Sequence, residues 1–232
     1  YLIIFFSITS IGETIIIDGK LDEKSWENAF IIDKYFEVKP FTLFPAKEKT
    51  ITKIFSNEEG IYIGFINYQE KSTMLSKKSM RDETPNNTDQ NGIAIDFDKD
   101  DQKAYMFQVT LGNVQADGIK PPGSWPRYDW DGDWEVATKK YDHYWVSEYL
   151  IPWNVVLMKD VKSELRDINI ATFRYVAHRQ TWLNDTKTWG NRVDFFQNMK
   201  SVQVDNFIKR KFNFFPFISS SKNSVTSFTE NK

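Results

Sequence analysis

A succession of short β-type runs, each bounded by turn residues, limits what this chain can fold into more than any other feature. Seven such runs occupy residues 50–56, 61–68, 93–98, 105–109, 134–138, 145–150 and 168–176. In the third run Ile93, Ile95 and Phe97 alternate with small or acidic residues, and a period of two is typical of a strand with one buried face. The sequence therefore predicts an all-β fold, an antiparallel β-sandwich of the jelly-roll type with one or two short helices.

The connections between the runs refine this prediction. Residues 57–60 have the composition of a hairpin turn, so 50–56 and 61–68 are expected to pair as neighbours. The second of these runs is apolar on both faces, which indicates a central strand. Two long segments, 71–91 and 112–133, are expected to be loops, and loops of that length are usually functional or disordered.

A short helix is expected to precede the first of these strands. Asp22 is placed to cap the free amides at its start, and the helix is expected to end near Ala29. Leu21 and Trp26 are spaced to pack against each other across its first turn.

The two ends of the chain differ from the part between them. Residues 1–12 contain an apolar run shorter than the roughly 20 residues that a bilayer requires, and they resemble the remnant of a secretory signal peptide. An ordinary first strand is the alternative. Residues 213–232 are rich in Ser, Thr and Asn, which is typical of a tail or of a linker to a further region. Residues 13–212 remain as one sandwich domain, expected to work outside the cytoplasm.

Charge and composition exclude several classes of function. The chain has 30 Lys and Arg against 32 Asp and Glu, so it lacks a basic surplus and no nucleic acid partner is expected. The absence of cysteine excludes disulfides, thiolate zinc sites and Cys nucleophiles. No nucleophile elbow, phosphate-binding loop or HExxH motif occurs. A glycosidase-type carboxylate pair stays open among so many acids, so an enzyme is not predicted but is not excluded.

Aromatic residues are in excess, with 19 Phe, 10 Tyr and 8 Trp, and several tryptophans gather beside arginines. The residues concerned are Trp125, Arg127 and Trp130 in one segment and Arg179, Trp182 and Trp189 in another. A rigid indole can stack on the C–H face of a sugar ring while a guanidinium bonds its hydroxyls, which makes these six residues candidates for binding a poly- or oligosaccharide. Burial in the core is the alternative for such rings, and it is the expectation for Trp134.

Acidic residues occupy every second position in the first of these segments. They are Asp129, Asp131, Asp133 and Glu135, with Gly132 among them. Oxygen ligands around a glycine turn suit a hard cation, so calcium is a candidate structural cofactor at these four residues. A solvated turn leading into an edge strand is the alternative. Further candidate ligands, if loops converge, are Asp82, Asp89, Asp96, Asp98 and Asp117.

Several motifs follow one another in an order that resembles family 9 carbohydrate-binding modules. Residues 17–29 read IDGKLDEKSWENA, similar to the family's IDGxLDExxWxxA, and residues 145–153 read WVSEYLIPW, similar to its WxxExxIPW. Matching positions between them include Arg81-Asp82, Asp117-Gly118 and the stretch 130–135. The resemblance covers residues 14–192 and is greatest to the family-9-like domain that precedes an outer-membrane barrel in many bacterial envelope proteins.

This resemblance implies a β-sandwich with a non-catalytic sugar-binding role, often attached to enzymes that degrade xylan or glucan. In the family, paired tryptophan rings grip a sugar and calcium ions brace loops; here Trp125, Trp182 and Trp189 lie where relatives vary. The location implied is the periplasm, the outer membrane or the exterior of a bacterium, with a barrel or an enzyme domain as a possible attachment. The alternative is a periplasmic structural or docking domain that has lost sugar binding, with every tryptophan packed inward or onto a protein partner.

Overall fold

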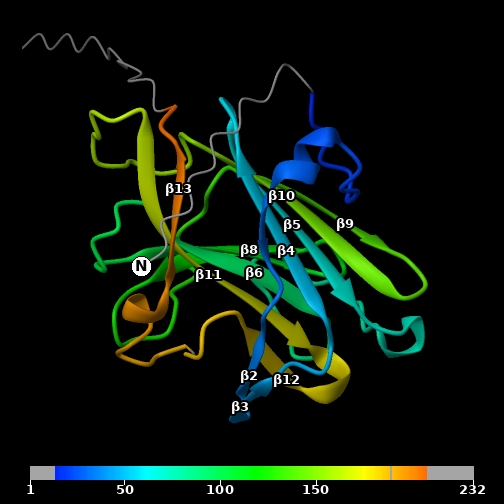
Figure 1. The fold of residues 1–232 in the computed structure, drawn as a ribbon. Coiled ribbons are helices and arrows are strands. Elements are labelled where there is room, and N and C mark those ends of the chain that lie inside the picture. The colour runs from blue at the N-terminus through cyan, green and yellow to red at the C-terminus, as the bar shows by residue number, and fades with distance from the viewer. Residues whose placement is uncertain (1–13, 189, 208–232) are drawn as a thin grey trace, which may run out of the picture.

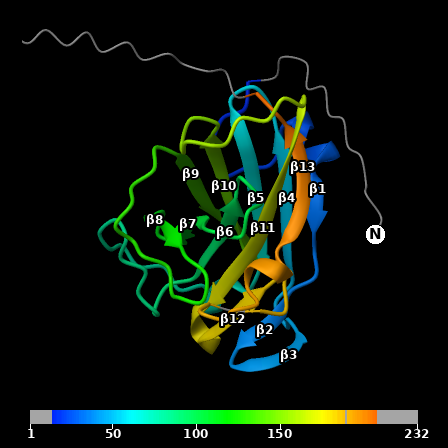
Figure 2. The same ribbon diagram turned by 90° about the vertical axis from the view of Figure 1, so that its left-hand side faces the viewer.

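Two antiparallel β-sheets pack face to face in the computed structural model, which describes residues 14–188 and 190–207 (Figure 1, Figure 2). The five-stranded sheet runs, in spatial order, β1 (Phe30–Ile32), β4 (Thr50–Ser56), β5 (Gly60–Tyr68), β10 (Tyr144–Pro152) and β9 (Glu135–Lys140). The eight-stranded sheet runs β3 (Phe41–Pro45), β2 (Phe36–Lys39), β12 (Thr181–Asn184), β11 (Leu165–Val176), β6 (Gln90–Asp96), β7 (Ala104–Thr110) and β8 (Gln115–Lys120), with β13 (Lys200–Asp205) also paired to β11. The predicted antiparallel β-sandwich is confirmed.

Helical structure in the described residues consists of four short 3₁₀ turns, η1 (Lys24–Asn28), η2 (Lys71–Thr73), η3 (Ala177–Arg179) and η4 (Phe196–Asn198). None of these described turns has the length or apolar character needed to cross a bilayer. The prediction that Asp22 caps the first helix was wrong, because the residue before η1 is Glu23 and no side chain caps the turn. Glu23 instead accepts the indole N–H of Trp26 at 3.0 Å. Leu21 and Trp26 share one apolar cluster, as predicted.

The seven predicted strands all form, and the runs with the strongest alternation lie at the centre of the sheets. β5 lies between β4 and β10, as expected for a strand that is apolar on both faces. The prediction that 112–133 is one loop was wrong in its first part, because β8 forms there and pairs with β7 over its whole length. The other strands that were not predicted are β1, β2, β3, β12 and β13.

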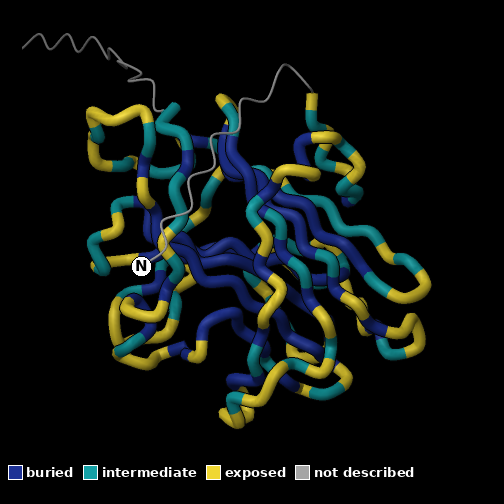
Figure 3. Tube along the Cα trace, viewed as in Figure 1, coloured by how far each residue is buried: buried dark blue, intermediate teal, exposed yellow. Residues whose placement is uncertain are grey.

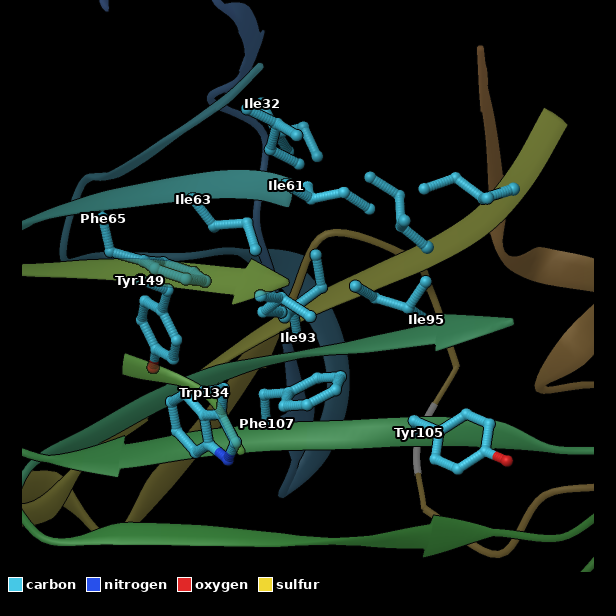
Figure 4. Close-up of a cluster of buried hydrophobic side chains, with 14 of the residues drawn as sticks. Ile32, Ile61, Ile63, Phe65, Ile93, Ile95, Tyr105, Phe107, Trp134 and Tyr149 are labelled. Atoms are coloured by element: carbon cyan, nitrogen blue, oxygen red, sulfur yellow. The ribbon is translucent and has the colours of Figure 1, made fainter. Parts of the chain in front are cut away.

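The main core fills the space between the sheets and is built from the inward-facing positions of both (Figure 4). Ile63 and Tyr149 contribute from the five-stranded sheet, and Ile93 and Phe107 from the other. Trp134 is buried here as expected, with its ring stacked on Tyr149 at a centroid distance of 5.5 Å. Figure 3 shows that buried backbone follows the strands while exposed backbone lies mainly in the connections.

β11 organises the eight-stranded sheet because it is long enough to pair with two strands along one edge. Its first half pairs with β13 and its second half with β12, while β6 lies along its other edge. Between β12 and β13 the chain leaves the sheet over residues 185–199. Asp185 fixes the start of this excursion, since its carboxylate accepts the Thr172 amide at 2.7 Å and pairs with Lys200.

The outer face of the eight-stranded sheet, which points away from the main core, carries a second apolar cluster. Ala94, Met106 and Phe173 contribute from the strands, and Phe195 and Phe196 from the excursion lie over them. Gly92 leaves the room that the Phe173 ring requires, since a Cβ there would come within 2.6 Å of that ring. Phe195 and Phe196 therefore cover one part of the outer face. The candidate site lies in the open part beside them.

Candidate functional site

A hollow of about 180 Å³ lies on the outer face of the eight-stranded sheet. Its floor comes from β7, β8, β11 and β12, and its rim from segments on either side of the sheet. The lining residues are Thr84, Asn86, Met106, Gln108, Lys120, Trp125, Pro126, Tyr128, Phe173, Trp182, Asn184, Gly190 and Phe195. Both long segments that the sequence singled out, 71–91 and 112–133, contribute to the rim.

The segment after β8 folds back over the strand that it has just left. Arg127 and Ile119 exchange two backbone hydrogen bonds, each 2.9 Å long. This close approach requires Gly118, because a Cβ at that position would lie 2.2 Å from the Arg127 carbonyl oxygen. Figure 2 shows the long connection between β8 and β9 looping along one side of the molecule. The return carries Trp125 to the rim of the hollow.

Trp125 is the most exposed ring of the lining, with 51% of its surface open to solvent. Its indole lies against the backbone of Gly190, where a Cβ would come within 2.4 Å of the ring. Gly190 also has a φ of +51°, a conformation that favours glycine. Backbone on the opposite side of the hollow thus supports the indole, and a supported ring loses little freedom when a ligand packs on it.

Trp182 supplies a second indole from the floor of the hollow. It extends from β12 on the outer face and lies against Tyr175 at a ring-centroid distance of 4.7 Å and Phe173 at 6.1 Å. The Tyr175 hydroxyl donates to the Asn86 carbonyl at 3.0 Å, which ties the rim to the sheet. Two indoles from separate segments therefore border one hollow and offer the flat apolar surfaces on which a sugar ring can stack.

Neutral polar side chains occupy fixed positions between these rings. The Gln108 amide donates to the Gln90 side-chain oxygen, and Asn184 Oδ1 accepts both the amide and the hydroxyl of Thr186 at 2.8 Å. These bonds direct the Oε1 acceptor of Gln108 and the Nδ2 donor of Asn184 toward further partners. A ligand with many hydroxyl groups can use both.

Lys120 is the charged residue of the lining, and it is only 1% exposed. Its ammonium donates to the Pro121 carbonyl at 2.9 Å and lies 4.8 Å from the ring centroid of Phe195 and 5.7 Å from that of Phe196. Burial lowers the pKa of Lys120 to about 8, because loss of water disfavours the charged form. The sequence reasoning missed this residue because β8 was taken for part of a loop.

The predicted tryptophans divide between the site and the core. Trp125 and Trp182 line the hollow together. Trp130 does not: its ring packs edge-on against Tyr105 and Phe107, with centroids 4.9 and 5.9 Å away, and so joins the main core. Trp189 lies outside the described residues.

The predicted arginines do not line the hollow either. Arg127 shapes the site through its backbone, and its side chain is exposed. Arg179 donates to Glu37 and to Glu48, each at 2.6 Å, and thereby ties η3 to β2 and to the segment before β4. Its planar guanidinium is therefore engaged in two ion pairs that hold the sheet edge together.

Three carboxylates come close enough to surround a cation in the described part of the chain, those of Asp82, Asp117 and Asp131. Their nearest oxygens lie within 4.8 Å of one another. Arg81 already supplies a positive charge there, since its guanidinium lies 2.6 Å from Asp117 and 3.2 Å from Asp131. The donor oxygens are of the kind that calcium prefers, but the arginine competes for them. Arg81 is therefore the cationic partner of this group.

The predicted calcium set is not brought together. Asp131 belongs to the group of three carboxylates, whereas Asp129, Asp133 and Glu135 lie outside it. Successive side chains surround one ion only where the chain turns back on itself, and residues 128–134 contain no turn.

Comparisons with known proteins bear on the fold. No protein-family model matches the sequence, and no curated protein is significantly similar to it. Among solved structures, a family 9 carbohydrate-binding module from Caldicellulosiruptor kristjanssonii in complex with cellotriose has a TM-score of 0.56 and 14% identity, covering 83% of this chain and 90% of that one. The fold is that of a family 9 module.

Two further structures agree with this. A family 9 module from the same organism in complex with glucose has a TM-score of 0.57 and 16% identity, covering 88% of this chain and 96% of that one. A candidate carbohydrate-binding protein from Bacteroides uniformis has a TM-score of 0.59 and 8% identity, covering 77% and 88%. At such low identity the likeness concerns the fold, and a site has to be argued from this chain's own residues.

Proposed function

We propose that this protein is a non-catalytic carbohydrate-binding module that holds a xylan- or glucan-like glycan against Trp125 and Trp182 and serves polysaccharide breakdown outside the cytoplasm. The observation that carries the proposal is the exposed indole of Trp125, supported by Gly190 at the rim of a hollow that contains a second indole. Apolar surface left in water costs about 25 cal/mol per Å² relative to burial. A ring fixed in that position favours a ligand that covers it.

The structures that share the fold support the same class of ligand. One family 9 module was solved with cellotriose and another with glucose. The hollow is small and bordered by flat rings, with neutral hydrogen-bonding groups between them, a mixture that suits a sugar with an apolar face and polar edges.

A docking domain without sugar binding predicts that every tryptophan is packed inward or onto a protein partner. Trp125 is not packed inward, since it is half exposed, so that alternative requires a protein partner that covers this ring. Glycoside hydrolysis requires two carboxylates across the ligand, and the residues that line the hollow include no Asp or Glu.

Calorimetric titration with xylo- and cello-oligosaccharides tests the proposal on the wild type, Trp125→Ala and a control variant. The control is Phe44→Ala, because Phe44 on β3 is a ring that is 67% exposed and lies outside the hollow. Loss of a central aromatic contact typically costs more than about 1 kcal/mol, so Trp125→Ala should bind at least about fivefold more weakly. The control should bind as the wild type does.

Thermal melting distinguishes a lost contact from a lost fold. Trp125→Ala should melt within a few degrees of the wild type, because half of the ring is already in solvent. The proposal fails if the wild type binds no sugar of the panel, or if both variants lose affinity equally.

A further inference from the structure

The hollow contains a positive charge without a counter-charge in its lining. Lys120 faces the outer side of the sheet, where it lies opposite Ala104 in the register of β7 and β8. The other lining residues are apolar, aromatic or neutral and polar, and none is acidic. The Lys120 ammonium is therefore the one charged group among the residues that line the hollow.

The other buried cations in the described residues, Arg174 and Arg166, have several acceptors or a carboxylate partner. Arg174 donates to four oxygens, from Lys49, Thr50, Tyr68 and Gln69, at 2.8–3.2 Å. Arg166 pairs with Asp98 and bonds two carbonyls.

Lys120 differs from these cations. Within the described residues its ammonium has one hydrogen bond, to the Pro121 carbonyl, and no carboxylate partner. The rings of Phe195 and Phe196 lie over it and offset part of the cost of burial through cation–π contacts. An ammonium carries three donors and Lys120 lines the hollow, so two donors remain for a ligand that enters it.

We propose that the hollow binds an acidic saccharide, with Lys120 receiving the carboxylate of a uronic acid residue while Trp125 and Trp182 stack on its pyranose ring. This inference rests on the proposed function and narrows its ligand. The carboxylate of a hexuronic acid is carried at the edge of the ring, so a sugar that lies flat on an indole extends it sideways. The resulting charge-assisted bond offsets the desolvation of the ammonium. A neutral sugar leaves that ammonium buried without a counter-ion.

Calorimetry with two oligosaccharides of equal length and linkage tests the proposal. One is a cello-oligosaccharide, and the other is the same chain oxidised at C6 to the uronate. Hydrogen bonds to charged groups contribute more free energy than neutral ones do, so the wild type should bind the uronate at least about tenfold more tightly than the cello-oligosaccharide. Lys120→Met keeps the apolar stem and removes the charge, so it should bind the two oligosaccharides about equally. Lys162→Met, a change at an exposed lysine outside the hollow, should keep the wild-type preference.

Thermal melting without sugar distinguishes a ligand-binding role of Lys120 from a purely structural one, because the two roles predict opposite changes in the Tm of Lys120→Met. Removal of a buried charge that lacks a carboxylate partner should raise the Tm of Lys120→Met by about 2–4 °C. A fall in Tm of that size would show that Lys120 serves the fold, and it would count against the proposal.

The outcomes separate this proposal from the broader one. Equal binding of both oligosaccharides by the wild type overturns the acidic ligand and leaves the sugar-binding function standing. If the wild type binds a C6-sulfated chain more tightly than the uronate, the proposal of a carboxylate ligand is wrong and the anionic group that Lys120 binds is a sulfate ester. Failure of the wild type to bind any of these chains overturns both proposals.

Discussion

Glu148 shows how one buried carboxyl links two distant motifs of the sequence. Its Oε2 accepts the backbone amides of Asp18 and Gly19, each at 3.0 Å, and so ties the segment before η1 to β10. The Oε1 atom is buried and has no hydrogen-bond partner. Burial is the main cause that raises the pKa of Glu148 to about 7, and the two amides lower it only in part.

The raised pKa of Glu148 predicts a pH-dependent stability. The unfolded pKa is near 4.5 and the folded pKa near 7, so the folded state binds this proton more tightly. Stability from this group is therefore complete below about pH 4.5 and is lost as the pH rises to about 7. Glu148→Gln keeps an acceptor oxygen and cannot ionise, so its stability relative to the wild type should increase between pH 5 and pH 8 by on the order of 2 kcal/mol.

Urea denaturation across that pH range measures the effect. Glu27→Gln removes an exposed carboxyl of the same length and should follow the wild type at every pH. Parallel curves for Glu148→Gln and the wild type would contradict the assignment.

At the scale of elements, the excursion between β12 and β13 determines where the Trp125 ring can lie. Gly190→Ala places a methyl group within 2.4 Å of that ring, whereas Gly123→Ala places one at an ordinary van der Waals distance, 3.8 Å from Val193. Both glycines have positive φ, so both substitutions carry a similar backbone cost of about 1–2 kcal/mol. We expect oligosaccharide affinity to fall about tenfold in Gly190→Ala and less than twofold in Gly123→Ala.

Titration calorimetry on these two variants, with melting curves to match their stability, separates ring displacement from backbone strain. An equal loss of affinity in both would mean that strain alone is responsible, and that Gly190 does not position the ring.

Alternation predicts the central strands well because the residues that face the main core recur there at every second position, as Ile93, Ile95 and Phe97 do. It misses β8 and β12, which are short and mix polar with apolar residues, so their pairing depends on neighbours that are distant in sequence. The same limit applies to the site. Trp125 and Trp182 stood out by residue type, but Lys120 reaches the hollow only because β8 forms. Gln108 could have been found, since it lies on the face of its strand opposite Phe107.

At the scale of the whole molecule, Arg81 joins the two long segments that border the hollow. Its guanidinium bonds Gln115 at 3.1 Å and the Gly132 carbonyl at 3.2 Å, in addition to the carboxylates of Asp117 and Asp131. One side chain from the first long segment thus holds β8 and the entry to β9 in place. Removal of the Arg81 charge should lower the stability of the protein and leave Asp117 and Asp131 able to bind a cation from solution, because these carboxylates lose their positive partner.

Arg81→Met should lower the free energy of unfolding by about 1–2 kcal/mol, because it leaves the buried Asp117 without a cation. Burial already raises the pKa of Asp117, so its charged form depends on that partner. Millimolar calcium should restore part of the lost Tm in this variant through binding to the folded state, and it should leave the wild-type Tm unchanged. Adding Asp131→Asn to Arg81→Met should abolish the calcium response, since one of the three ligands is lost. A wild-type Tm that rises with calcium and falls with a chelator would show instead that the cation displaces Arg81 or binds elsewhere.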